Sequence, residues 1–156
     1  MKISLISVGT RMSDWVNAGV EEYRRRLPAD FALEMVEVAL APRGKNADIR
    51  RARQKEGAAL LARVPRGDRV VAMEVGGRSL TTEALAARLE ALRMEGQNLS
   101  LLVGGPDGLD DRCLQQSHEQ WSLSALTLPH PLVRIVLAEQ IYRAWTLCVG
   151  HPYHRG

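Results

Sequence analysis

The C-terminal residues from Pro152 to Arg155 combine side chains that are suited to a functional surface. Tyr153 offers a ring for stacking, His154 offers an imidazole for proton transfer, and Arg155 offers a guanidinium suited to a phosphate group. We therefore predict that this tail is a functional surface, and that Tyr153, His154 and Arg155 are candidate catalytic residues.

A second candidate for proton transfer is His130, which lies between Pro129 and Pro131. The alternative is that this histidine is simply a turn residue. The pair His151 and His154 lacks a regular helical spacing, and no carboxylate or thiol lies beside it in the sequence. We therefore expect no metal site.

Two loops have the composition of a ligand site. The apolar segment 99–103 is followed by the run Gly104-Gly105-Pro106-Asp107-Gly108 and then a helix pattern, and this is where open α/β sheets bind ligands. The run is neither a dinucleotide fingerprint nor a P-loop, and its aspartates would repel a pyrophosphate. It suits a nucleoside, the alternative being a plain turn. The second loop, residues 123–131, has backbone groups that can bond the edge of a flat heterocycle.

Positive charge is concentrated between Arg43 and Lys55, where six basic residues accompany one acid, Asp48. The whole chain has a formal net charge of +3. Such a cluster attracts a polyanion through phosphate neutralisation and counterion release. The alternative is a solvated helix face. We predict RNA contacts from five of these residues: Arg43, Lys45, Arg50, Arg51 and Arg53.

The hydrophobic pattern alternates between strands and helices along all 156 residues, with no linker long enough to divide the chain. Strands are expected at residues 2–8, 32–38, 68–75, 99–103 and 120–123. Helices are expected from 14 to 27, from 46 or 48 to 64, from 81 or 82 to 96, from 110 to 116 and from 131 to 149. Gly76-Gly77 is expected to turn the chain after the third strand. This order predicts one domain, residues 1–156, of the α/β class, with a mainly parallel sheet sandwiched by helices.

The chain shows no signal-peptide pattern and no apolar run near the ~20 residues of a membrane span. Its two cysteines, Cys113 and Cys148, are far apart in sequence and are expected to be reduced thiols. We therefore expect a cytoplasmic protein without a membrane partner.

The last predicted helix is apolar over much of its circumference. Leu137, Ile141 and Trp145 belong to a stripe at helical spacing, and Leu132 and Ile135 extend the apolar character around the helix. Such a helix needs more than one surface to cover it. A second copy of the chain in a C2 homodimer provides that surface, and a central core helix is the alternative.

Several motifs taken together resemble the RlmH (YbeA) family of SPOUT methyltransferases, and the resemblance covers the whole chain. They include the opening Val8-Gly9-Thr10 and the segment Arg43-Gly44-Lys45-Asn46-Ala47-Asp48-Ile49. The others are Gly104-Gly105-Pro106-Asp107-Gly108-Leu109, Leu123-Ser124-Ala125-Leu126-Thr127-Leu128-Pro129-His130, Glu139-Gln140-Ile141-Tyr142-Arg143-Ala144 and His151-Pro152-Tyr153-His154-Arg155. The order and spacing of these motifs make the match specific.

The resemblance implies a homodimer with a C-terminal trefoil knot, an exception to the rule that chains do not thread their own loops. It implies transfer of a methyl group from S-adenosylmethionine to N3 of a pseudouridine in the helix 69 loop of 23S rRNA, on the assembled ribosome. The implied cofactor contacts are Met73, Gly104, Leu123, Ser124, Ala125, Leu126, Thr127 and Leu128.

Two other functions fit the residues. A non-catalytic module that binds the ribosome or RNA would use the basic segment and the tail without a cofactor. A SPOUT methyltransferase acting on tRNA would use the same cofactor loops with another acceptor. Binding of S-adenosylmethionine separates the first alternative from the enzyme, and the identity of the methylated RNA separates the second.

Overall fold

A parallel five-stranded sheet forms the centre of the computed structural model, which describes residues 1–44 and 48–155. The strands are β1 (Lys2–Val8), β2 (Ala32–Val38), β3 (Arg69–Ser79), β4 (Leu99–Val103) and β5 (Glu119–Ser122), in the order β2-β1-β4-β3-β5. Every pair of neighbouring strands is parallel. The predicted α/β class with a mainly parallel sheet is therefore confirmed.

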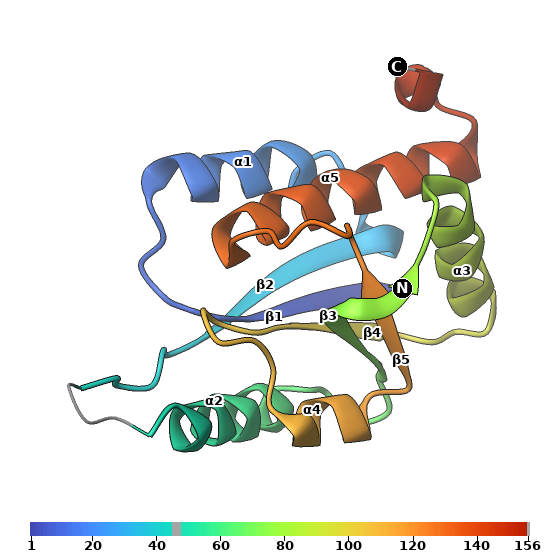
Figure 1. The fold of residues 1–156 in the computed structure, drawn as a ribbon. Coiled ribbons are helices and arrows are strands. Elements are labelled where there is room, and N and C mark those ends of the chain that lie inside the picture. The colour runs from blue at the N-terminus through green and yellow to red at the C-terminus, as the bar shows by residue number, and fades with distance from the viewer. Residues whose placement is uncertain (45–47, 156) are drawn as a thin grey trace.

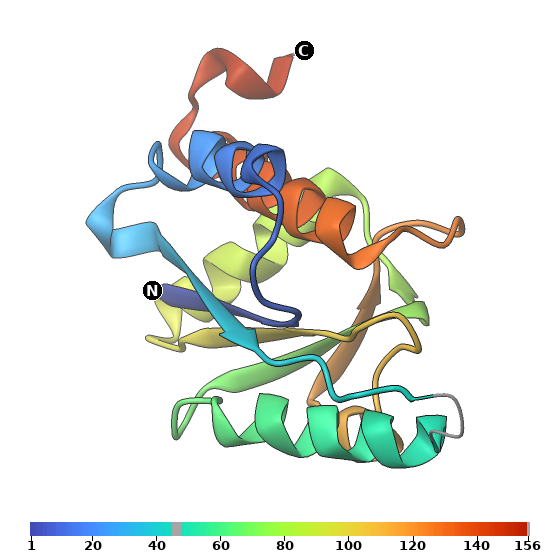
Figure 2. The ribbon, with the colours of Figure 1, turned by 90° about the vertical axis from the view of Figure 1, so that its left-hand side faces the viewer.

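Helices cover both faces of this sheet (Figure 1). One layer holds α1 (Asp14–Arg24), α3 (Thr82–Met94) and α5 (His130–Val149), and the opposite layer holds α2 (Ile49–Ala62) and α4 (Asp111–Gln116). Two short 3₁₀ helices, η1 (Ala29–Phe31) and η2 (Pro152–Arg155), complete the elements. The turned view shows α2 below the sheet with α1 and α5 above it (Figure 2).

Each face of the sheet has its own hydrophobic core. Ile3, Leu5 and Leu101 point to the side that packs against Val20, Leu89 and Leu137 of α1, α3 and α5. Their neighbours Ile6 and Leu102 point to the other side and pack with Leu60 and Cys113 of α2 and α4. This alternation follows from the two-residue period of a strand, and β4, buried along its whole length, lies at the centre of the sheet.

Local sequence signals explain where several elements begin and end. The Asp48 side chain accepts a hydrogen bond from the Arg51 backbone N–H and caps α2, and Thr81 caps α3 in the same way through Ala84. Gly150 ends α5 in the left-handed conformation, with φ of 72°. The predicted strands 32–38 and 99–103 match the structure.

The predicted turn at Gly76-Gly77 is wrong, because β3 continues through both glycines to Ser79. The pairing of β3 with β5 shifts in register between Met73 and Arg78. A Cβ atom at Gly77 would lie 2.8 Å from the backbone carbon of Gln120. Gly77 therefore permits a close approach of two strands at a bulge rather than a reversal of the chain.

The last helix is one residue longer than predicted, beginning at His130. It packs against α1 and α3 as well as the sheet, and Glu139 and Arg143 form an i,i+4 ion pair at 2.7 Å. Leu132 and Val149 remain exposed on it. Along residues 1–44 and 48–155, no helix is both long and apolar enough to cross a membrane. The homodimer and the trefoil knot remain predictions.

Candidate functional site

A cavity of about 700 Å³ lies at the carboxyl ends of β4 and β5, beside the middle of β3. Its lining comes from the middle of β3, the turn after β4, the end of β5, the loop that joins β5 to α5, and the start of α5. This is the edge at which open parallel sheets bind ligands. Seven of the eight predicted cofactor residues line it: Met73, Gly104, Leu123, Ser124, Leu126, Thr127 and Leu128. Ala125 belongs to the same loop but is exposed and does not line the cavity.

The turn after β4 can form only with glycine at particular positions. A Cβ atom at Gly104 would lie 2.6 Å from the backbone carbon of Gly108, so the backbone at these two residues is too close to leave room for a side chain at Gly104. Gly108 has φ of 79°, and its N–H donates to the Gly105 carbonyl at 3.0 Å. The turn therefore presents bare backbone to the cavity.

The loop between β5 and α5 is stabilised by its own serines. The Ser122 hydroxyl donates to the Ser124 carbonyl at 3.0 Å, and the Ser124 hydroxyl accepts from the Leu126 N–H at 2.9 Å. The Leu126 side chain remains 73% exposed although it borders the cavity. The backbone of this loop is therefore held beside the cavity by hydrogen bonds of its own side chains.

The charge of the lining restricts the ligand. Among the described residues that line the cavity there is no lysine or arginine, and the carboxylate present is Glu74. Phosphate groups are usually bound by cationic side chains. The side-chain charge of the lining therefore suits a neutral or cationic ligand better than a di- or triphosphate.

His130 is the proton-transfer candidate that the fold places in the cavity wall. Its Nδ1 atom is buried without a hydrogen-bond partner among the residues described. Burial lowers the pKa of His130, and the nearby positive charge of Arg134 lowers it further, against a smaller opposing effect of Glu56. The lowered pKa favours the neutral imidazole and makes it a weaker base than an ordinary histidine.

A buried arginine that the sequence analysis missed lies beside His130. Arg134, 2% exposed, donates to the Gly9 carbonyl at 2.7 Å and forms a 2.5 Å ion pair with Glu37. It ties the start of α5 to the turn after β1 and to the end of β2. An arginine within an apolar helical stripe is the signal that could have indicated this role.

The predicted catalytic residues of the tail lie elsewhere. The Tyr153 hydroxyl donates to Glu139 Oε1 at 3.2 Å, its ring meets the Tyr142 ring edge-on at 4.7 Å, and the Arg143 guanidinium lies 5.0 Å from its centroid. Burial, followed by the charge of Glu139, raises the pKa of Tyr153 to about 12. The tail is thus packed on its own helix.

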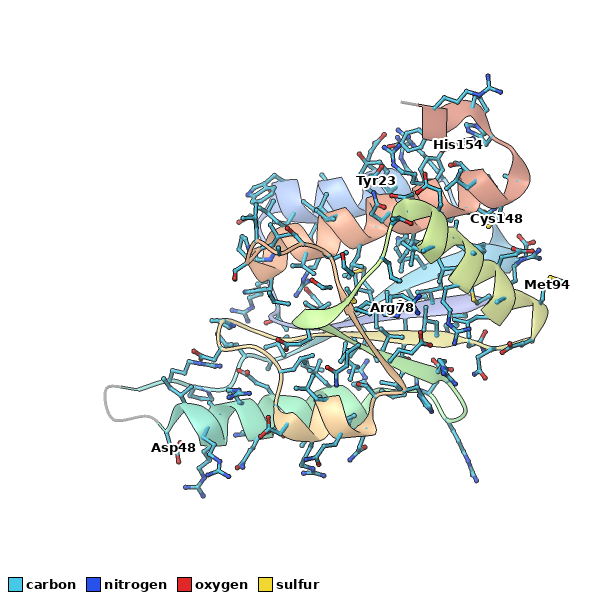
Figure 3. The ribbon with its side chains drawn as sticks, turned by 45° about the vertical axis from the view of Figure 1, so that its right-hand side comes forward. Tyr23, Asp48, Arg78, Met94, Cys148 and His154 are labelled. Atoms are coloured by element: carbon cyan, nitrogen blue, oxygen red, sulfur yellow. The ribbon has the colours of Figure 1, made fainter. Side chains whose placement is uncertain are left out.

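The tail and His130 are separated by the geometry of α5. Glu139 follows His130 by nine residues, which corresponds to about 14 Å of helix rise and roughly half a turn around the axis. None of the residues from Tyr153 to Arg155 lines the cavity. Figure 3 shows His154 beyond the C-terminal end of α5 and Asp48 in the opposite layer. One chain therefore does not bring its own tail to its cavity.

The predicted RNA contacts divide into two groups. Arg50 and Arg51 are exposed on the first turn of α2. Arg43 and Arg53 instead turn inward, Arg43 to Glu56 and Asp107, and Arg53 to the Leu109 carbonyl at 2.6 Å. Lys45 lies outside the described residues. The guanidinium groups of Arg43 and Arg53 therefore interact with groups of the same chain, which the clustering of basic residues did not indicate.

In residues 1–44 and 48–155, no three histidine, cysteine, aspartate or glutamate side chains are grouped so that they could hold a metal ion. Cys113 is buried, and desolvation raises the pKa of its thiol to about 11. The thiol is therefore protonated and unreactive at neutral pH.

Comparison with known proteins identifies the class to which this fold and cavity belong. The family model described as "Predicted SPOUT methyltransferase" matches residues 1–154. A probable methylase family protein from Haemophilus influenzae Rd KW20 has a similar fold, with a TM-score of 0.57 and 13% identity over 97% of this chain and 69% of that one. The chain therefore belongs to the SPOUT methyltransferases.

Two curated relatives are 59% identical over 155 residues, which is 99% of this chain and the full length of each relative. They come from Marinomonas sp. and Chromohalobacter salexigens, and both are named ribosomal RNA large subunit methyltransferase H. Within the SPOUT methyltransferases the chain belongs to the RlmH family, which confirms the resemblance seen in the sequence motifs.

Proposed function

We propose that this protein transfers a methyl group from S-adenosylmethionine to N3 of a pseudouridine in the helix 69 loop of 23S rRNA. The substrate is the assembled ribosome in the cytoplasm, and the enzyme is a homodimer whose chains each form one domain, residues 1–156. Support for an rRNA substrate comes from the names of the full-length relatives. Support for the donor comes from the family and from the cavity.

The absence of cationic side chains among the described lining residues is the observation that carries the choice of donor. S-adenosylmethionine supplies an electrophilic methyl group on a positively charged sulfur, and a lining with Glu74 and without lysine or arginine does not repel it. The volume of about 700 Å³ lies within the range of pockets that bind molecules of this size. Met73, the Gly104 turn and the loop from Leu123 to Leu128 would hold it.

The chain's own residues then have to position the acceptor and remove its proton. N3 of pseudouridine carries a proton, so a base near the acceptor accelerates the transfer. His154 is the first candidate and His130, held neutral in the cavity wall, is the second. Tyr153 stacks on the target base and Arg155 binds a phosphate. Alignment of donor and acceptor supplies much of the remaining acceleration.

A homodimer resolves the separation of the tail from the cavity. Because Tyr153 packs on the side of α5 that faces away from His130, the tail completes a site only by reaching the cavity of a second chain. The exposed Leu132 and Trp15 on α5 and α1 give this layer apolar surface for such a partner. The exposed Arg50 and Arg51 provide the RNA contacts on α2.

The proposal is tested with purified protein in two steps. Calorimetry with S-adenosylmethionine should show binding, whereas absence of heat and of a thermal shift would favour the non-catalytic RNA-binding module. Labelled methyl transfer should then appear on assembled ribosomes from cells that lack the enzyme, and not on tRNA. Label in tRNA alone would identify a SPOUT enzyme with another substrate.

A further inference from the structure

The segment before α2 is tied to the glycine turn through one arginine. Arg43 Nε donates to Asp107 Oδ2 at 2.7 Å. Its two terminal nitrogens donate to Glu56, Nη1 to Oε2 at 2.6 Å and Nη2 to Oε1 at 3.0 Å. Nη1 also donates to the Ala41 carbonyl at 2.8 Å. All three nitrogens of the guanidinium are therefore engaged inside the chain, and the side chain is only 20% exposed.

Glu56 explains why Arg43 stays in this position. The Glu56 side chain is 2% exposed, and it also accepts a hydrogen bond from the Ala41 backbone N–H at 3.0 Å. A buried carboxylate without a cationic partner is strongly destabilising, so releasing Arg43 to another anion would be costly. The hydrogen bonds from Glu56 first, and from Asp107 second, raise the pKa of Arg43 above its ordinary value.

Asp107 connects this pair to the cavity. Its neighbours Pro106 and Gly108 line the cavity, whereas Asp107 does not and instead meets Arg43 on the outer side of the turn. Two further contacts fix the same turn to α2. Arg53 donates to the Leu109 carbonyl, and Gly57 approaches Asp110 so closely that a Cβ atom would lie 2.8 Å from the Asp110 Cβ.

We propose that Arg43 is a positioning residue for the donor pocket: anchored by Glu56, it holds Asp107 and thereby fixes the glycine turn in the shape that receives the donor. This inference rests on the proposed function, because it assigns Arg43 to the methyl-donor side of the site rather than to RNA. Its physical basis is that Gly104, Gly105 and Gly108 give the turn little stiffness of its own. An external contact therefore determines how precisely its backbone faces the ligand.

The test compares Arg43→Gln and Asp107→Ala with Arg51→Gln, a control at an exposed position of the same basic segment. The dissociation constant of S-adenosylhomocysteine is measured by calorimetry. We expect Arg43→Gln and Asp107→Ala each to weaken binding about tenfold, the usual effect of losing a hydrogen bond between charged groups. Arg51→Gln should leave this constant unchanged. If Arg43→Gln does not fold, Asp107→Ala carries the test, because it keeps the Arg43–Glu56 pair.

Two further readouts separate positioning from a general structural effect. With ribosomes as substrate, KM for the donor should rise in Arg43→Gln and in Asp107→Ala, while kcat at saturating donor is largely kept. The double variant should bind S-adenosylhomocysteine no more weakly than Arg43→Gln alone. The slope of ribosome affinity against salt should not change for Arg43→Gln. An unchanged donor constant with a slope reduced by about one would assign Arg43 to an RNA phosphate and overturn the inference.

The wild-type titration distinguishes the two levels of the proposal. Failure of the wild-type protein to bind the donor product would refute the proposed function and this inference with it. Wild-type binding together with unchanged binding by both variants would refute the inference alone.

Discussion

The shared active site can be tested by combining two different defects in one dimer. One chain carries Gly104→Ala, which places a Cβ atom 2.6 Å from the Gly108 backbone and disrupts the turn of the cavity. The other chain lacks residues 153–156 and therefore the tail. Two affinity tags, one on each chain, allow the mixed dimer to be purified.

The expected activity follows from which chain completes which site. If the tail acts on the partner's cavity, the intact cavity of the shortened chain receives the intact tail of the Gly104→Ala chain, so one site of two works. The mixed dimer should then have about half the wild-type rate. If each tail served its own cavity, both sites would be defective and no methyl transfer would remain.

The matched control places both defects on one chain and pairs it with a wild-type chain. If the tail acts on the partner's cavity, the cavity of the wild-type chain receives no tail, and the tail of the wild-type chain reaches a cavity that carries Gly104→Ala. Activity should therefore be lost. The two mixed dimers are assayed by transfer of labelled methyl to ribosomes. Activity in the control together with none in the first dimer would refute the reasoning from the geometry of α5.

Three other predictions concern folding and assembly. Sedimentation should give twice the chain mass of 17.3 kDa at micromolar concentration, and a stable monomer would contradict the dimer. Gly57→Ala should lower the free energy of unfolding by about 1–3 kcal/mol through the clash with Asp110, whereas Gly76→Ala, with open space around it, should change it little. The pKa of His130 is lowered in the folded chain, so His130 takes up a proton at higher pH in the unfolded chain than in the folded one. The free energy of unfolding therefore falls as the pH is lowered through the ordinary histidine range. In thermal melts, His130→Gln should reduce this loss of stability between about pH 7.5 and 5.5.

Local patterns in the sequence were sufficient for most of the fold. Alternation and buried apolar runs predicted the strands at 32–38 and 99–103. Helix starts were predicted at 46 or 48 and at 81 or 82, and the structure has Asp48 and Thr81 as the capping residues. These signals depend on neighbours along the chain. The turn predicted at Gly76-Gly77 failed because the role of Gly77 depends on β5, more than 40 residues later.

The same distinction applies to the site. Loop composition predicted ligand sites at the run from Gly104 to Gly108 and at residues 123–131, and the family resemblance implied cofactor contacts from Leu123 to Leu128. The cavity lies between these two loops. Charge clustering could not show that Arg43 is bound by Glu56 and by Asp107, because the latter is 64 residues away. Nor could it show that the tail packs on its own helix. Both features depend on tertiary contacts, and the sequence of one segment does not indicate which other segment it contacts.

The central claim is best tested by mapping methylation in 23S rRNA from cells that lack this protein. The helix 69 loop is isolated and its nucleosides are identified by mass spectrometry, with tRNA from the same cells as a comparison. The account predicts that the pseudouridine loses its N3 methyl group, that a plasmid copy of the gene restores it, and that tRNA is unchanged. A helix 69 pseudouridine that remains methylated in the deletion strain would contradict the account.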